Sequence, residues 1–304
     1  MDLITTNEIC KKYGDKLVID HVNMHIPEHS IYGFVGENGS GKTTIMRLLT
    51  GLAELTSGSF TLFGVNNKDK KIYEVRRNLS AIVEATSLVP TLTARDNIIF
   101  QELYLGIKQS EEERMALLKK VHLEDVGEKR VKNFSLGMRQ RLGIALALMN
   151  HPKLMLLDEP MNGLDPEGIA ELRDLLIELN QKEGITVLIS SHILSELEKI
   201  ASYYGFISHG QLLEELSAEE LQEKCRKSLN VKVDDLFKAE EALKKINLRD
   251  YKSSPNGEIK IFDNVKINDV IIALDKNNVN VLAINSSDES VEDYYLNLIK
   301  EGHK

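Results

Sequence analysis

The stretch GENGSGKT, residues Gly36–Thr43, constrains the fold of this chain more than any other part of its sequence. It matches the phosphate-binding pattern G-x-x-x-x-G-K-[ST], and it lies after the strand-like run IYGFV and before the helix-like run KTTIMRLL, as that pattern requires. A glycine-rich turn that ends in GKT by chance would lack this setting. The stretch therefore predicts a P-loop, which joins a buried strand to a helix in an α/β core.

The residue types inside this loop explain how it would hold phosphate. Gly36, Gly39 and Gly41 let the backbone curl so that successive N–H groups face a polyphosphate at the helix N-terminus, where the helix dipole also favours an anion. Lys42 supplies a mobile positive charge, and Thr43 offers a hydroxyl to Mg²⁺. The loop is therefore expected to bind a nucleotide with its metal ion.

Two later stretches repeat the order of an apolar strand followed by a helix. LMLLD precedes a helical pattern over residues 166–180, and ITVLISSH precedes one over residues 193–201. Asp165 can cap the first of these helices, Pro166 fits its first turn and Gly184 ends it. This alternation predicts a mostly parallel sheet covered by helices.

Two regions depart from that alternation. Helical patterns dominate residues 85–150, which predicts a helical insert in the α/β core. After Ser217 the order of strand and helix patterns resembles a β-α-β-β-α-β split unit of the ferredoxin-like kind, with a short strand near Leu248. We therefore expect a nucleotide-binding domain over residues 1–217 and a small α+β domain over residues 218–304.

The bulk composition narrows the possible partners and compartments. The net charge of -9 disfavours broad binding to DNA or RNA, which needs faces dense in Lys and Arg. Cys10 and Cys225 lie far apart, so their spacing implies neither a disulfide framework nor a zinc site. No apolar run reaches the roughly 18 residues that a membrane span needs, and the N-terminus lacks the order of a signal peptide. A cytosolic protein is expected.

Two adjacent carboxylates mark the end of the strand LMLLDEP. Asp158 and Glu159 would lie at the carboxyl edge of the sheet, where open α/β sheets bind ligands, and they would repel each other without a cation. A magnesium ion held by Thr43 and, through water, by Asp158 resolves this repulsion and leaves Glu159 free to orient or deprotonate a water molecule. The alternative is an acid pair that only precedes the helix at Pro166.

Two further polar features are ambiguous when taken alone. FSLGMRQR places Ser135 at the cap and Gly137 in the first turn of an apolar helix, which makes a second helix N-terminus suited to an anion. A serine at this position is more often only a cap. His192 follows ITVLISS, and a lone histidine at a strand end usually bonds to a backbone group.

The ordered set of these motifs resembles the ATP-binding cassette (ABC) ATPases from Met1 to about Leu216. KKYGD, GENGSGKTT, FSLGMRQ, LMLLDEP, NGLD and His192 look like the aromatic, Walker A, signature, Walker B, D-loop and switch-histidine elements of that family. The resemblance implies an N-terminal antiparallel β part, ATP and Mg²⁺ as ligands, and a head-to-tail homodimer that closes on ATP. It departs from the family at Met138, where the signature normally has a glutamine.

The resemblance also assigns roles to individual residues. Tyr13 would stack on adenine, Ser135 and Gly137 would hold the γ-phosphate from the other subunit, and His192 would sense it. Asp165 of NGLD would belong to the nucleotide site. The phosphates would be held by the whole loop and the start of its helix: Gly36, Glu37, Asn38, Gly39, Ser40, Gly41, Lys42, Thr43 and Thr44.

Glu84 in VEATSLVPTLT occupies the place where the family normally has a glutamine that touches the metal and the attacking water. The glutamate, the following loop and the signature helix look like those of the bacitracin- and lantibiotic-resistance ABC transporters. The resemblance thus implies that Glu84 belongs to the site rather than being a surface charge. The expected metal ligands are Thr43, Asp158 and Glu84, and the expected catalytic residues are Lys42, Glu84, Glu159 and His192.

The sequence thus predicts an ATPase subunit, peripheral to the inner face of the membrane, that drives a separate permease exporting or clearing a peptide antibiotic. An exporter of sodium, lipid or general drugs is one rival, and an ABC protein acting on nucleic acid or ribosomes is another. The single cassette, the acidic charge and the lack of a long heptad insertion between Thr43 and Ser135 disfavour the second rival.

Overall fold

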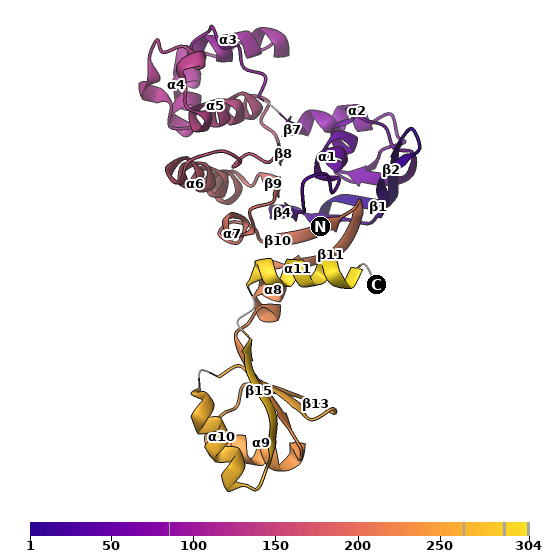
Figure 1. The fold of residues 1–304 in the computed structure, drawn as a ribbon. Helices are drawn as coiled ribbons and strands as arrows, with labels where there is room; N and C mark the ends of the chain where they lie inside the picture. The colour runs from indigo at the N-terminus through magenta and orange to yellow at the C-terminus, as the bar shows by residue number, and fades with distance from the viewer. Residues whose placement is uncertain (85, 264, 288–289, 303–304) are drawn as a thin grey trace. The chain divides into compact units, whose positions relative to one another are not determined.

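The computed structural model describes residues 1–84, 86–263, 265–287 and 290–302, and it forms two compact units, Met1–Ala218 and Glu219–Lys304. Each unit has a hydrophobic core of its own. Figure 1 shows their elements, and each unit is described by itself. None of the helices among the described residues is long and apolar enough to cross a membrane.

A six-stranded sheet forms the centre of the first unit, in the order β11-β10-β4-β9-β8-β7. All neighbouring strands are parallel except β10 and β11. The buried runs IYGFV and TVLISS form β4 and β9 at its middle, because strands covered on both faces need apolar residues on both. The bounds of the strands are β4 Ile31–Val35, β7 Leu79–Ile82, β8 Leu154–Asp158, β9 Thr186–Ser191, β10 Tyr203–Ser208 and β11 Gln211–Ser217.

A second, antiparallel sheet comes mainly from the N-terminal part of the chain. Its strands are β1 Asp2–Tyr13, β2 Lys16–Val22, β3 His25–Pro27, β5 Ser57–Leu62 and β6 Val65–Asn66. Helix α1, Lys42–Thr50, packs with buried residues of both sheets, such as Ile4 of β1 and Leu156 of β8. Short helices α2, Ile72–Val75, and η1, Arg76–Asn78, lead into β7. The P-loop helix is therefore held between two sheets.

Helices on the opposite face of the central sheet from α1 complete the unit (Figure 1). They include α5, α6 and α7, and α5 contacts β7 while α6 contacts β9. Asp165 caps α6 by accepting a hydrogen bond from Gly168, and Gly184 ends it in a left-handed conformation, as the sequence predicts. The bounds are α5 Leu136–Leu148, α6 Pro166–Glu183 and α7 Leu194–Leu197.

The helical insert consists of α3, Ala94–Leu105, α4, Glu111–Lys120, and α5, with 3₁₀ turns η2, Glu124–Val126, and η3, Val131–Asn133. Its expected first residue, Ala85, lies outside the described residues. Thr93 caps α3, and Ser110 and Glu113 form a capping box on α4. These caps explain where the two helices begin.

The second unit contains the four-stranded antiparallel sheet β13-β14-β12-β15. With one helix after β12 and one after β14, this is the strand order of the predicted split unit, and its short second strand begins at Tyr251. Helix α8 begins one residue before the unit boundary. The bounds are α8 Ala218–Lys224, β12 Ser228–Val233, α9 Leu236–Lys245, β13 Tyr251–Ser254, β14 Glu258–Ile261, α10 Ile267–Lys276, β15 Val281–Ser287 and α11 Val291–Gly302.

Candidate active site

The P-loop joins β4 to α1, and two of its glycines are required by close contacts. A Cβ on Gly36 would lie 2.6 Å from the carbonyl oxygen of Ile207. Gly41 has a φ of 115°, and a Cβ there would lie 2.5 Å from Cδ1 of Ile19. The loop therefore keeps its curled backbone only with glycine at these positions.

The side chain of Lys42 is buried in this loop, with 5% of it exposed. Its ammonium donates hydrogen bonds to the carbonyl oxygens of Gly36 at 2.6 Å and Glu37 at 3.1 Å, and it lies 3.2 Å from Oε1 of Glu159. The hydroxyl of Ser40 is also buried and has no hydrogen-bond partner among the residues that the structure describes. A buried donor without a partner is costly, and a phosphate oxygen would satisfy it.

Asp158 and Glu159 lie at the carboxyl end of β8, beside the P-loop helix. Oδ2 of Asp158 accepts a hydrogen bond from the hydroxyl of Thr43 at 2.7 Å, so the structure brings together two of the three residues expected to hold magnesium. Both offer oxygen atoms, which Mg²⁺ prefers as ligands. The residues present therefore fit a magnesium ion.

Glu159 connects the Walker-B strand to two other predicted residues. Its Oε2 lies 2.8 Å from Nδ1 of His192, while its Oε1 faces Lys42. Lys42, Glu159 and His192 come from α1, the end of β8 and the end of β9, and they meet because β4, β8 and β9 are parallel neighbours. The carboxyl edge of the sheet thus gathers a cation, a carboxylate and an imidazole.

Comparison with known proteins identifies the family. The sequence model of the ABC transporter family matches residues 19–162. The chain is 40% identical to the bacitracin transport ATP-binding protein BcrA of Bacillus licheniformis, over 99% of this chain and 98% of that protein. The chain belongs to the ATP-binding proteins of ABC transporters. It is an ATPase of this family, and the predictions of family and fold class are confirmed.

Other relatives agree with this assignment. BcrA of Enterococcus faecalis is 37% identical over 99% of this chain and 97% of that protein. The lantibiotic transport ATP-binding protein SrtF of Streptococcus pyogenes is 44% identical, over 69% of this chain and 89% of that protein. Among solved structures, a dimeric bacterial ABC transporter cassette is 26% identical with a TM-score of 0.62, over 71% of this chain and 98% of that chain.

The other residues expected in the ABC nucleotide site lie at separate places in the first unit. Tyr13 ends β1, is half-exposed, and has the ammonium of Lys11 4.8 Å from its ring centroid. Ser135 caps α5 by accepting a hydrogen bond from the N–H of Met138 at 3.2 Å. Gly137 lies in the first turn of that helix. The structure thus gives Ser135 and Asp165 capping roles within one chain, and their nucleotide contacts remain predictions.

The structure gives Glu84 an unpredicted partner. Its carboxylate forms an ion pair with Arg47 of α1, and 59% of the Glu84 side chain is exposed. Glu84 lies two residues after the end of β7, and its backbone has a left-handed φ of 70°. Nothing in the ABC motifs marks Arg47, so sequence reasoning missed this pair. The predicted metal and catalytic role of Glu84 stays a prediction.

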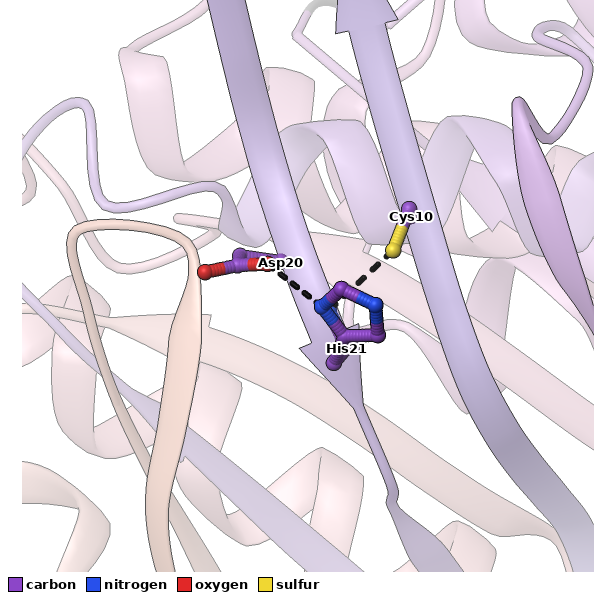
Figure 2. Close-up of side chains that lie close together, drawn as sticks. All are labelled: Cys10, Asp20 and His21. Carbon is purple, nitrogen blue, oxygen red and sulfur yellow. Dashed lines mark hydrogen bonds and ion pairs between the residues drawn. The ribbon is translucent and has the colours of Figure 1, made fainter.

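A second polar cluster, formed by Cys10, Asp20 and His21, lies on β1 and β2 (Figure 2). Nδ1 of His21 lies 2.6 Å from Oδ1 of Asp20, and the N–H of His21 donates to Sγ of Cys10 at 3.3 Å. Hydrogen bonds lower the pKa of Asp20, and the bond from Gln211 has a larger effect than the one from His21. The two strands shift register at this point, and His21 has a φ of 49°, so these contacts stabilise the irregular pairing.

Proposed function

We propose that this ATPase powers the export, or the clearance from the membrane, of a peptide antibiotic of the bacitracin or lantibiotic type through a separate permease. The observation that carries the proposal is the extent of the similarity. The two BcrA proteins match 99% of this chain, and therefore both of its units, whereas SrtF matches 69% of it. The second unit is thus shared with proteins whose names specify bacitracin transport.

Each residue of the site has a role in this proposal. Lys42, the hydroxyl of Ser40 and the N–H groups of the P-loop bind the phosphates of ATP, and Tyr13 stacks on the adenine. Thr43 and Asp158 hold Mg²⁺, which neutralises charge on the phosphates, and Glu84 strengthens that site. Glu159 orients the attacking water and takes its proton, and His192 contacts Glu159.

The proposal includes a homodimer that closes on ATP. Ser135 is exposed at the N-terminus of α5, where the helix dipole favours an anion, and Gly137 leaves the first turn uncrowded. This helix end can therefore contact the γ-phosphate bound to a second copy, and it lies beside the N-terminus of α6, which Asp165 caps. A dimeric cassette among the similar structures supports this arrangement.

A cleft on the first unit suits the permease. It lies between β7 and helices α3 and α5, and its lining includes Thr86, Phe100 and Tyr104. Phe100, Leu103 and Tyr104 of α3 are large apolar residues that are mostly exposed, and such patches mark protein interaction sites. Because Thr86 follows Glu84 by two residues, a permease segment in this cleft would act on the segment that carries Glu84. This partner places the ATPase at the cytoplasmic face of the membrane.

The test is to reconstitute the ATPase with its permease in vesicles and to measure ATP hydrolysis with bacitracin, with a lantibiotic and with neither. Stimulation by one of the peptides is expected. The complex with Glu159→Gln should show no stimulated hydrolysis. Stimulation by sodium or by a lipid-soluble drug, with no response to either peptide, would reject the proposed cargo while leaving the ATPase assignment unchanged.

A further inference from the structure

Ser190, near the end of β9, contacts both acidic residues of the proposed active site. Its side chain is completely buried. The hydroxyl donates a hydrogen bond to Oδ1 of Asp158 at 2.7 Å and accepts one from the backbone N–H of Glu159 at 2.8 Å. This contact follows from the sheet register, because Ser190 lies opposite Asp158 in the parallel pair of β8 and β9.

The first hydrogen bond fixes the orientation of the Asp158 carboxylate. Oδ1 is occupied by Ser190, and Oδ2 accepts the hydroxyl of Thr43. The two contacts hold opposite oxygens of one carboxylate, so its plane has little freedom to rotate. A metal-binding oxygen thereby stays directed at the P-loop helix.

The second hydrogen bond supports a strained turn at Glu159. This residue has a φ of 48°, a left-handed conformation that is unfavourable for a residue other than glycine. The turn takes Glu159 out of β8 and directs its carboxylate to Lys42 and His192. Its backbone N–H would lack a strand partner after this turn, and the hydroxyl of Ser190 accepts it.

We propose that Ser190 is a positioning residue for ATP hydrolysis, whose single hydroxyl sets the orientation of both the metal-binding Asp158 and the base Glu159. The inference rests on the proposed roles of those two residues. Ser190 touches neither ATP nor water in this mechanism, and it acts through its two neighbours. Residues that orient metal ligands in this way typically change metal affinity or activity about 10–100-fold when they are replaced.

The strand provides a matched control at the next residue. Ser191 is also buried, and its hydroxyl accepts a hydrogen bond from the N–H of Ile193. Ser191→Ala therefore removes a hydroxyl of the same kind from the same strand without touching Asp158 or Glu159. Ser190→Thr keeps the hydroxyl, and Ser190→Cys keeps the volume but offers only a weak donor and acceptor.

The experiment measures kcat and the KM for ATP in the full chain, and it measures the Mg²⁺ requirement both from hydrolysis and, without turnover, from calorimetric titration of a non-hydrolysable ATP analogue at several Mg²⁺ concentrations. Ser190→Ala is expected to lower kcat by about 10–100-fold and to raise the Mg²⁺ requirement, while the KM changes little because Lys42 and the P-loop are intact. Ser190→Cys should show the same pattern, Ser190→Thr should recover most of the activity, and Ser191→Ala should match the wild type.

Glu159→Gln, measured alongside, separates this inference from the proposed function. If Glu159→Gln is inactive while Ser190→Ala and Ser190→Cys hydrolyse ATP normally, the positioning role is wrong and the active site stands. Equal losses in Ser190→Ala and Ser191→Ala would also overturn it, because a general packing effect would then explain both. Normal hydrolysis by Glu159→Gln would instead overturn the proposed active site.

Discussion

At the scale of single residues, the buried ammonium of Lys42 should make the largest side-chain contribution to phosphate binding. It lies among loop carbonyls and 3.2 Å from Glu159, and charge-assisted hydrogen bonds are roughly twice as strong as neutral ones. We expect Lys42→Ala to abolish hydrolysis at saturating Mg-ATP while its circular dichroism spectrum matches that of the wild type. Normal turnover by this variant would contradict the P-loop assignment.

Glu159→Gln should bind ATP and hardly hydrolyse it. The amide keeps the shape of the side chain and loses the base, and removal of a general base typically lowers the rate by about 10²–10⁴-fold. ATP-bound dimers should then accumulate, which size-exclusion chromatography with and without ATP would detect. A variant that remains monomeric with ATP would argue against a site shared between two subunits.

The role of Glu84 can be tested against its partner Arg47. If Glu84 supports the metal, Glu84→Gln should retain some hydrolysis and need more Mg²⁺, because a neutral amide binds the ion less strongly than a carboxylate. Glu84→Ala should lose hydrolysis, and cells that produce this variant should lose resistance to the proposed peptide antibiotic. Arg47→Ala, which removes only the ion pair seen in the structure, should leave the Mg²⁺ requirement unchanged.

A magnesium titration of the wild type, Glu84→Gln, Glu84→Ala and Arg47→Ala decides whether the Glu84 carboxylate supports the metal or only pairs with Arg47. If Arg47→Ala and Glu84→Ala lose the same activity, the ion pair and not the metal is what matters at Glu84. If all four proteins share one Mg²⁺ dependence and one level of resistance, Glu84 is a surface charge.

At the scale of elements, the sequence predicts best what is encoded locally. The P-loop with its flanking strand and helix, and the capped helix α6, follow from neighbouring residues and are found where expected. The two hydrogen bonds of Ser190 to Asp158 and Glu159 depend on the register of β8 against β9. The Arg47–Glu84 ion pair joins residues that are 37 positions apart in the sequence. Contacts of this kind require the packed sheet, so no single stretch of sequence signals them.

An ion-pair network that joins α3 to α4 should make the stability of the helical insert depend on pH. Arg114 donates hydrogen bonds to Glu102 and Glu111, and Arg95 also donates to Glu111. Hydrogen bonds from Arg95 and Arg114 lower the pKa of Glu111 to about 2, and the hydrogen bond from Arg114 lowers the pKa of Glu102. Both contributions to stability are complete above the ordinary pKa of 4.5 and weaken as the pH falls below it, and the contribution of Glu111 is lost as the pH approaches 2.

Arg114→Met should therefore lower the melting temperature more at pH 7 than at pH 3, since pH 3 lies below the ordinary pKa of the glutamates and part of the stability from their pairing with Arg114 is already lost there. Differential scanning calorimetry at the two pH values measures the effect. Lys119→Met, at an exposed position of the same helix, is the matched control and should show little change at either pH. An equal drop for Arg114→Met at both pH values would mean that packing of the side chain, and not its charge, stabilises the insert.

At the scale of the whole molecule, the sequence predicts two domains because the pattern of strands and helices changes after Ser217. The structure has two units with separate cores, and the second has the predicted strand order. One chain does not contain a complete proposed site, because Ser135 and Gly137 would contact nucleotide bound to a second copy. The proposed dimer thus rests on the similarity to the family and not on a contact within the chain.

The last prediction is that the first unit alone binds and hydrolyses ATP. All residues of the proposed site lie before Ala218, and so do the residues of the hydrophobic core cluster that surrounds α1. A chain that ends after Ser217 should therefore fold, bind ATP with the affinity of the full chain and keep its basal hydrolysis, with Lys42→Ala in the shortened chain as the inactive control. Calorimetric titration with ATP and an ATPase assay measure both properties. If the shortened chain is soluble and folded but binds ATP weakly, the second unit must complete the nucleotide site or the dimer, and its presence in the full-length BcrA relatives would then reflect hydrolysis itself rather than transport.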